Sequence, residues 1–201
     1  MQFNFKYKPL INLLNQTFVY LLLVQTLATI SETVLTTLSA KEDIHFEIVE
    51  PETLRYTYRA RMAQNFGTTF SQIYSNMNLV IVEPNDSCTS LVNTLELFNN
   101  IGLIERGGCS FLAKCIVAEM SGMVGVIIYD NNHSNDDLYI EMVTDNTTRN
   151  CSIPAAFLLG KDGHMIRRAL DAHRLNRAVV NIPVNISQKT VKLRQPPWVV
   201  W

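Results

Sequence analysis

A stretch near the middle of the chain alternates between apolar runs and short polar turns, and it predicts a strand, a turn, a helix and a second strand in succession. Residues 103–104 form a short apolar strand, and the turn over 105–108 contains two glycines, which permit backbone angles that other residues resist. Ser110 stands where a helix N-cap is expected, ahead of a helix over 111–120. The continuous apolar run over 124–129 predicts a buried strand of the parallel type. None of these residues is an obvious catalytic group.

Weaker patterns flank this unit on both sides. Alternation of apolar and polar residues predicts strands before it, and an amphipathic helix followed by a last strand is expected after it. A strand-rich first half followed by alternating strands and helices is typical of an α/β domain with a mixed sheet. The expected elements are strands within 43–60, over 79–82 and over 178–183, a short helix over 90–99 and a helix over 161–172, with loops over 61–78 and 131–137.

The N-terminal segment has the pattern of a secretory signal. Lys6 and Lys8 precede an apolar run over 10–30, and small residues near Ala28 suit cleavage. The alternative is an uncleaved membrane anchor, since the run is nearly long enough to cross a bilayer. Asparagine and glutamine side chains interrupt its apolarity, so we expect 1–28 to be a cleaved signal. The product is then expected to be secreted, with no stable membrane insertion after cleavage.

Composition excludes some classes of partner. The chain has 17 basic and 18 acidic side chains, and removal of the signal takes away two lysines, which leaves a net charge of −3. A mildly acidic surface provides no electrostatic reason to expect nucleic acid or an anionic membrane as partner. The glycine pair at 107–108 lacks the further glycine and lysine of a nucleotide-binding loop. The sequence indicates no cofactor and leaves the oligomeric state open.

The cysteines and the glycosylation motifs agree with a secretory compartment. Four cysteines lie beyond the signal, and an even number in an oxidising compartment predicts two disulfides, for which three connectivities are possible. Asn-x-Ser/Thr triplets are also more frequent beyond residue 40 than chance predicts. We expect glycans at Asn185, Asn132, Asn146 and Asn85, and Asn150 is the least suited because Cys151 lies inside its triplet.

The central unit resembles the protease-associated (PA) domain family. The family signature is an arginine-glycine-x-cysteine-x-phenylalanine run, a lysine three residues later and a hydrophobic strand. The matching residues here are Arg106, Gly107, Cys109, Phe111, Lys114 and the strand over 124–129. The resemblance implies an α/β fold of β/β/α layers, with a curved mixed β-sheet and two or three helices packed on one side. We therefore expect a single PA domain over 44–187 and a C-terminal tail over 188–201.

The resemblance also bears on the disulfides. A family member that shares further segments with this chain has its two mature cysteines at the positions of Cys88 and Cys109, so the resemblance implies this pair. Cys115 and Cys151 depart from that pattern together, which predicts a second bridge between the central helix and the start of the strand that the resemblance implies over 153–159. The same relative has a glycosylation motif at the position of Asn185, which makes this asparagine the first candidate for a glycan.

Two places suggest catalytic or metal chemistry. Cys109 lies at a helix start, where the pKa of a thiol is lowered, but a sulfur in a disulfide cannot attack a substrate. The loop from Asp130 to Glu141 has the spacing of a calcium loop, but its sixth position is Asn135 rather than glycine, and a strand precedes it. No Gly-x-Ser-x-Gly elbow and no His-x-x-x-His pair is present. We therefore expect neither a catalytic residue nor a metal site.

Four side chains are candidates for contacts with a partner. Arg106 lies in the turn and Lys114 on the following helix, although ion pairing with neighbouring glutamates or simple solvation accounts for both. Trp198 and Trp201 lie near the end of the chain, and two tryptophans are costly to leave in water. They either pack onto the domain's own sheet, the interpretation we favour, or anchor a partner.

Two functions from different classes remain. The first is a secreted, non-enzymatic glycoprotein whose PA domain binds an unidentified protein or peptide. The resemblance implies such a role, because PA domains gate the substrates of proteases and recognise cargo in sorting receptors. No protease catalytic module lies in the chain, so the partner is expected to act in trans. The alternative is a small secreted hydrolase or a calcium-dependent binding protein that uses the Cys109 turn or the loop from Asp130 to Glu141.

Overall fold

The computed structural model describes residues 20–22, 24–25, 43–187 and 193–198. The chain divides into two units, Met1–Lys41 and Glu42–Trp201, and every strand among the described residues lies in the second. The signal expected over 1–28 lies outside the described residues, except for 20–22 and 24–25, which are helical. Among the residues described, no helix combines the length and the apolar character that crossing a membrane requires.

The order of elements in the second unit follows the expected alternation. The differences are at boundaries: β3 begins at Tyr74 rather than at 79, because its first half is partly exposed and lacks an apolar signal, and the short helix shrinks to Thr94–Leu97. The strands are β1 (Asp43–Glu50), β2 (Thr57–Met62), β3 (Tyr74–Ile81), β4 (Ile101–Glu105), β5 (Gly125–Tyr129), β6 (Ala155–Leu158) and β7 (Arg177–Ile182). The helices are η1 (Glu52–Leu54), α2 (Thr94–Leu97), α3 (Phe111–Met120) and α4 (Gly160–Ala172).

The sheet is mixed, as predicted, and it closes into a barrel with the strand order β1-β2-β6-β5-β4-β3-β7. Strands β3, β4, β5 and β6 run parallel to their neighbours within that group, and the remaining pairs are antiparallel. Antiparallel pairing of β1 with β7 closes the sheet. The carboxyl ends of β4, β5 and β6 therefore meet at one end of the barrel.

The interior of the barrel is the main hydrophobic core. It contains buried side chains from all seven strands, including Ile127 and Tyr129 of β5. Ile166 and Leu170 of α4 belong to the same cluster. Helix α4 thus packs against the interior face of the sheet.

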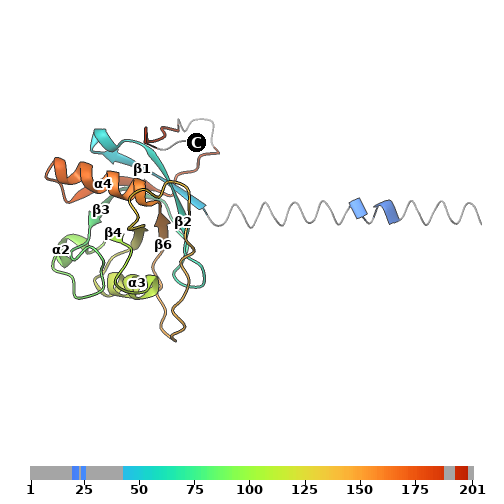
Figure 1. Ribbon diagram of the computed structural model, residues 1–201, viewed down its shortest axis with the longest axis horizontal. Helices are drawn as coiled ribbons and strands as arrows, with labels where there is room; N and C mark the ends of the chain where they lie inside the picture. The colour runs from blue at the N-terminus through green and yellow to red at the C-terminus, as the bar shows by residue number, and fades with distance from the viewer. Residues whose placement is uncertain (1–19, 23, 26–42, 188–192, 199–201) are drawn as a thin grey trace, which may run out of the picture. The chain divides into compact units, whose positions relative to one another are not determined.

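A second hydrophobic layer lies on the outer face of the parallel strands. Val126 and Ile128 of β5 pack there with Leu112 and Ala118 of α3. All five residues of β5 are buried, because successive side chains of a strand point to opposite faces and a helix covers each face. Helices α3 and α4 therefore lie on opposite faces of the sheet (Figure 1), which corrects the expectation that the helices pack on one side.

Helix α3 begins where the sequence predicts. The hydroxyl of Ser110 accepts a hydrogen bond from the backbone N–H of Ala113 at 3.1 Å, which satisfies one of the free N–H groups at a helix start. Gly122 follows the helix with a positive φ of 77°, a conformation that favours glycine. The helix is thereby held between the turn after β4 and the start of β5.

Candidate ligand-binding pocket at the ends of the parallel strands

A pocket of about 320 Å³ lies where β4 and β5 end, beside the first turns of α4. Ligands of α/β sheets bind outside the carboxyl ends of parallel strands, because loops from different strands meet there. The residues that line this pocket are of polar or charged types and include both signs of charge, although much of the surface that they expose comes from their apolar atoms. The lining residues are Asn85, Glu105, Tyr129, His133, His164, Arg167, Arg168 and Asp171.

Two histidines stack at one side of this pocket. The rings of His133, from the loop after β5, and His164, from α4, lie 4.1 Å apart between centroids with an interplanar angle of 18°. His133 Nε2 lies 3.5 Å from a carboxylate oxygen of Glu105. Partial burial lowers the pKa of His164, and the neighbouring His133 and Arg168 lower it further. A carboxylate entering here would meet two imidazoles and an exposed guanidinium.

Arg167 of α4 connects several of the residues that line this pocket. Its guanidinium lies 3.7 Å from Glu105 and 3.8 Å from Asp171, and it donates a hydrogen bond to the phenol of Tyr129 at 3.4 Å. Burial raises the pKa of Tyr129 to about 12, so the phenol stays protonated at physiological pH. These contacts join the ends of β4 and β5 to α4, so the pocket walls are linked by charge as well as by packing.

Arg106, a predicted partner contact, is tethered beside this pocket. Its guanidinium donates a hydrogen bond to Asp130 at 2.9 Å, and its side chain keeps 38% of its surface exposed, whereas that of Asp130 keeps 3%. Burial acts to raise the pKa of Asp130, but the hydrogen bonds from Arg106 and Asn135 outweigh burial and lower it. Arg106 therefore anchors the loop after β5 and still presents a surface to solvent.

The loop considered for calcium is stabilised by its own amides. Asn135 donates to the second carboxylate oxygen of Asp130 at 2.7 Å, and the backbone N–H of Ser134 donates to the side chain of Asn132 at 3.2 Å. Glu141 is exposed to solvent. Among the described residues, no three side chains of His, Cys, Asp or Glu are grouped so that they could hold a metal ion. Asparagine amides thus make the contacts to Asp130 that a cation would make in a calcium loop.

Lys114, the other predicted contact in this region, is completely buried. Its ammonium donates hydrogen bonds to the backbone carbonyls of Asp86 and Gly107 and lies 3.4 Å from Cys88 Sγ. Burial lowers the pKa of this ammonium, and the carboxylates of Asp86 and Glu105 act in the opposite direction. The expectation of a partner contact is therefore corrected: Lys114 joins the loop after β3 to the turn after β4.

Both disulfides expected from the sequence are present in the structure. Cys88 is bonded to Cys109, which joins the same loop and turn that Lys114 connects. Cys115 of α3 is bonded to Cys151, just before β6, with a Cα–Cα distance of 6.0 Å. Cys109 therefore has no free thiol to serve as a nucleophile.

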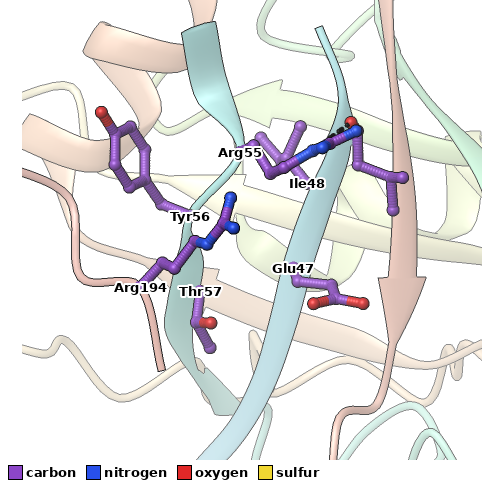
Figure 2. A pocket seen from close by; sticks show the side chains of 7 residues that line it. Glu47, Ile48, Arg55, Tyr56, Thr57 and Arg194 are labelled. Carbon is purple, nitrogen blue, oxygen red and sulfur yellow. Dashed lines mark hydrogen bonds between the residues drawn. The ribbon is translucent and has the colours of Figure 1, made fainter. Parts of the chain in front are cut away.

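A second hollow, of about 280 Å³, lies between the β1–β2 region and the described part of the C-terminal tail. The backbone N–H of Thr57 donates to the carbonyl of Arg194 at 2.7 Å, which holds the tail beside the start of β2. Figure 2 shows Arg194 and Thr57 on one side of this hollow and Glu47 of β1 on the other. Arg55 turns to the carbonyl of Val49, to which it donates at 3.1 Å.

Trp198 packs against the domain rather than extending into solvent. Its indole N–H donates to a carboxylate oxygen of Asp162 at 2.8 Å, and its ring meets Tyr56 edge to face at a centroid distance of 5.5 Å. Asp162 is almost fully buried in the first turn of α4, and burial raises its pKa to about 6. Trp201, the other predicted contact, lies outside the described residues.

Replacing Asp162 by asparagine is expected to flatten the dependence of stability on pH. The pKa of Asp162 rises from 3.8 to about 6 on folding, so its favourable contribution is complete below about pH 4 and is lost as the pH rises through about 6. Asp162→Asn keeps an acceptor for Trp198 but cannot ionise. It should match the parent chain at about pH 4 and exceed it by roughly 3 kcal/mol at about pH 7 in urea unfolding. An equal difference at both pH values would contradict this.

The glycosylation motifs differ in accessibility. Asn132, Asn146, Asn150 and Asn185 are exposed, whereas Asn85 is half-buried and its carbonyl accepts a hydrogen bond from the backbone N–H of Glu105 at 2.8 Å. Exposure is needed for glycan attachment, so the surroundings of Asn85 suit it least of the four predicted sites.

Sequence reasoning did not find the histidine pair or Arg167. The two histidines are 31 positions apart, and their spacing matches no metal-binding motif. They meet because the loop after β5 and the start of α4 both lie at the same end of the sheet. The sequence contained only an indirect signal for this contact, because residues that follow parallel strands converge at one edge of the sheet.

Comparisons with known proteins agree with the family resemblance of the motif in the turn after β4. The PA domain family model matches residues 75–166. A PRADC1-like protein of Drosophila melanogaster is 42% identical over 162 residues, which cover 79% of this chain and 83% of that protein. ER degradation-enhancing alpha-mannosidase-like protein 3 of Homo sapiens is 33% identical over 92 residues, or 44% of this chain and 10% of that protein.

Solved structures give a weaker similarity. An aminopeptidase from Aneurinibacillus sp. strain AM-1 has 18% identity and a TM-score of 0.49, over 70% of this chain and 30% of that chain, which supports no statement about activity. The sequence comparisons are stronger, since one relative matches most of both chains and the family model includes the glycine turn, α3 and β5. The resemblance seen in the Arg106–Lys114 region is thereby confirmed, and the chain belongs to the PA domain family.

Proposed function

We propose that this chain is a secreted, non-catalytic glycoprotein that binds a protein or peptide in trans through the pocket at the ends of β4 and β5. The observation that carries the proposal is a difference between two groups of residues in this region. Cys109 and Asp130, which suggested catalysis or metal binding, are held in a disulfide and in hydrogen bonds. The adjacent pocket instead presents histidine and arginine side chains to solvent.

The absence of catalysis is supported by the contacts of the candidate groups. Cys109 is bonded to Cys88, and Asp130 is hydrogen-bonded to Arg106 and Asn135. Nucleophilic catalysis requires an activated hydroxyl or thiol beside a base, and neither group is in such a state. The hydrolase and calcium alternatives both depended on these two positions.

Binding in the pocket is supported by its size and its lining. About 320 Å³ is within the range of ligand pockets and accommodates one or two side chains of a peptide. Membership of the PA family agrees with such a role, because PA domains are protein-interaction modules. The histidines and Arg168 favour a peptide that carries a carboxylate.

Secretion and glycosylation are supported by the chemistry of the chain. Two disulfides are typical of proteins that mature in an oxidising compartment. Asn185 is exposed, and its side-chain oxygen accepts a hydrogen bond at 3.0 Å from the backbone N–H of Ser187 in the same triplet. The signal-like segment over 1–28 is consistent with the same compartment.

The proposal is tested with a phage-displayed random heptapeptide library selected on the purified full chain. We expect selected peptides to bind with micromolar affinity and to be recovered intact by mass spectrometry. The double variant His164→Ala with Arg168→Ala should weaken binding at least about ten-fold, because both side chains line the pocket.

The matched control is Arg55→Ala with Arg194→Ala, which alters the other hollow and should leave peptide affinity unchanged. Equal loss in both double variants would place binding elsewhere and contradict the proposed site. Cleaved peptides would contradict the non-catalytic assignment.

A further inference from the structure

The two disulfides differ in their surroundings. Cys115 and Cys151 are buried, with 0% and 1% of their surfaces exposed, inside the layer between α3 and the sheet. Cys88 and Cys109 are both partly exposed at the surface turn after β4. A soluble thiol can therefore approach the Cys88–Cys109 disulfide in the folded protein, but it cannot approach the Cys115–Cys151 disulfide.

A buried cation contacts one sulfur of the exposed pair. The ammonium of Lys114 has three N–H donors, and its partners are the carbonyls of Asp86 and Gly107 and the sulfur of Cys88, at 3.4 Å. A lysine beside a cysteine stabilises the thiolate over the thiol and lowers the pKa of the thiol. Because Lys114 is completely buried, water screens this attraction little.

At the turn after β4, the backbone of Gly108 passes close to Cys88 Sγ. Gly108 is exposed and has a positive φ of 77°, and a Cβ at this position would lie 2.9 Å from Cys88 Sγ. Any other residue would therefore crowd the disulfide as well as strain the backbone. Cys109 comes directly before Ser110, the N-cap of α3, so the positive end of that helix favours the approach of an anionic thiolate to the sulfur of Cys109.

We propose that the Cys88–Cys109 disulfide is a thiol–disulfide exchange site that reacts with a dithiol reductant. The thiolate of the reductant attacks Cys109 Sγ, and the S–S bond breaks with its electron pair passing to Cys88 Sγ, beside Lys114. The second thiol of the reductant then attacks the mixed disulfide and releases Cys109. The reductant leaves as a disulfide, and its two protons pass to Cys109 and to solvent. A stabilised leaving thiolate speeds this type of exchange.

The fold retains other links after reduction. Lys114 still binds the carbonyls of Asp86 and Gly107, and the Cys115–Cys151 bond still holds α3 to the segment before β6. The segment that is released lies next to Asn85 and Glu105, which line the pocket. Exchange would therefore alter one wall of the pocket without unfolding the domain.

The test starts from the purified full chain with both disulfides formed. It is incubated with dithiothreitol under native conditions, quenched with acid, alkylated and analysed by peptide mass spectrometry, while near-ultraviolet circular dichroism monitors folding. We expect Cys88 and Cys109 to be reduced, as shown by their alkylation after the quench, at least about ten-fold faster than Cys115 and Cys151. The near-ultraviolet circular dichroism spectrum of the folded chain should be retained. Equal rates, or a rate that tracks loss of the spectrum, would overturn the proposal.

Two further measurements test the direction of attack. With glutathione as a monothiol, the trapped adduct should be on Cys109, and an adduct on Cys88 would overturn the assignment of Cys88 as leaving group. In Cys109→Ser, the pKa of the Cys88 thiol, measured from thiolate absorbance, should be at least about one below the ordinary value of about 8.5. A value at or above 8.5 would count against the role of Lys114.

Discussion

Replacement of Gly163 by alanine is expected to lower the free energy of unfolding by about 4 kcal/mol or more. Gly163 lies in the first turns of α4, where the helix crosses β5 so closely that a Cβ would be 2.2 Å from the Cβ of Tyr129. Tyr129 belongs to β5 and is fixed by hydrogen bonds with neighbouring strands, so neither element can move alone. Urea unfolding followed by circular dichroism measures the loss.

The matched control is Arg168→Ala, which introduces the same residue at an exposed position of the same helix. Alanine favours helices, so this change should alter the free energy of unfolding by no more than about 0.5 kcal/mol. A Gly163→Ala chain as stable as the control would mean that α4 does not approach β5 this closely.

The variant Lys114→Met is expected to lose about 3 to 5 kcal/mol of stability. Methionine fills a similar volume, so packing is largely retained, but the carbonyls of Asp86 and Gly107 lose their donor. A buried polar group without a partner is costly because it has also lost its contacts with water. The free energy of unfolding at neutral pH, measured in urea with the disulfides intact, provides the comparison.

Lys161→Met serves as the control for that change. Lys161 forms an ion pair with Asp136 at 2.9 Å, but both side chains are about one third exposed. Exposed pairs contribute about 0–1 kcal/mol, so this variant should be nearly as stable as the parent chain. Similar losses in the two lysine variants would indicate that methionine itself, rather than the lost hydrogen bonds, destabilises the fold.

The central unit was predictable because its signals are local. The turn glycines, the N-cap at Ser110 and the apolar run of β5 all lie within 28 consecutive residues, and each acts through backbone conformation or side-chain periodicity. The motif that resembles PA domains lies in the same stretch. The continuous apolar run of β5 indicates that both faces of the strand are buried, but it does not show which element covers each face, so the placement of α3 and α4 on opposite faces was missed.

The candidate site was predicted only in part. Arg106 and the glycine turn are beside the pocket, but the assignment of Lys114 to a partner was wrong, because a lysine on a helix is exposed far more often than buried. The pairing of His133 with His164 was missed, since it depends on the contact between a loop and a helix that follow different strands.

The sequence by itself determined the order of strands and helices, the PA family, and the turn that presents Cys109 and Arg106. These features follow from short-range backbone preferences and from side-chain periodicity. The tertiary structure decided the rest: β1 pairs with β7 to close the barrel, Lys114 is buried between two loops, and the pocket forms where strand ends meet α4. Each of these depends on contacts between residues far apart in the chain, whose partners a local pattern does not specify.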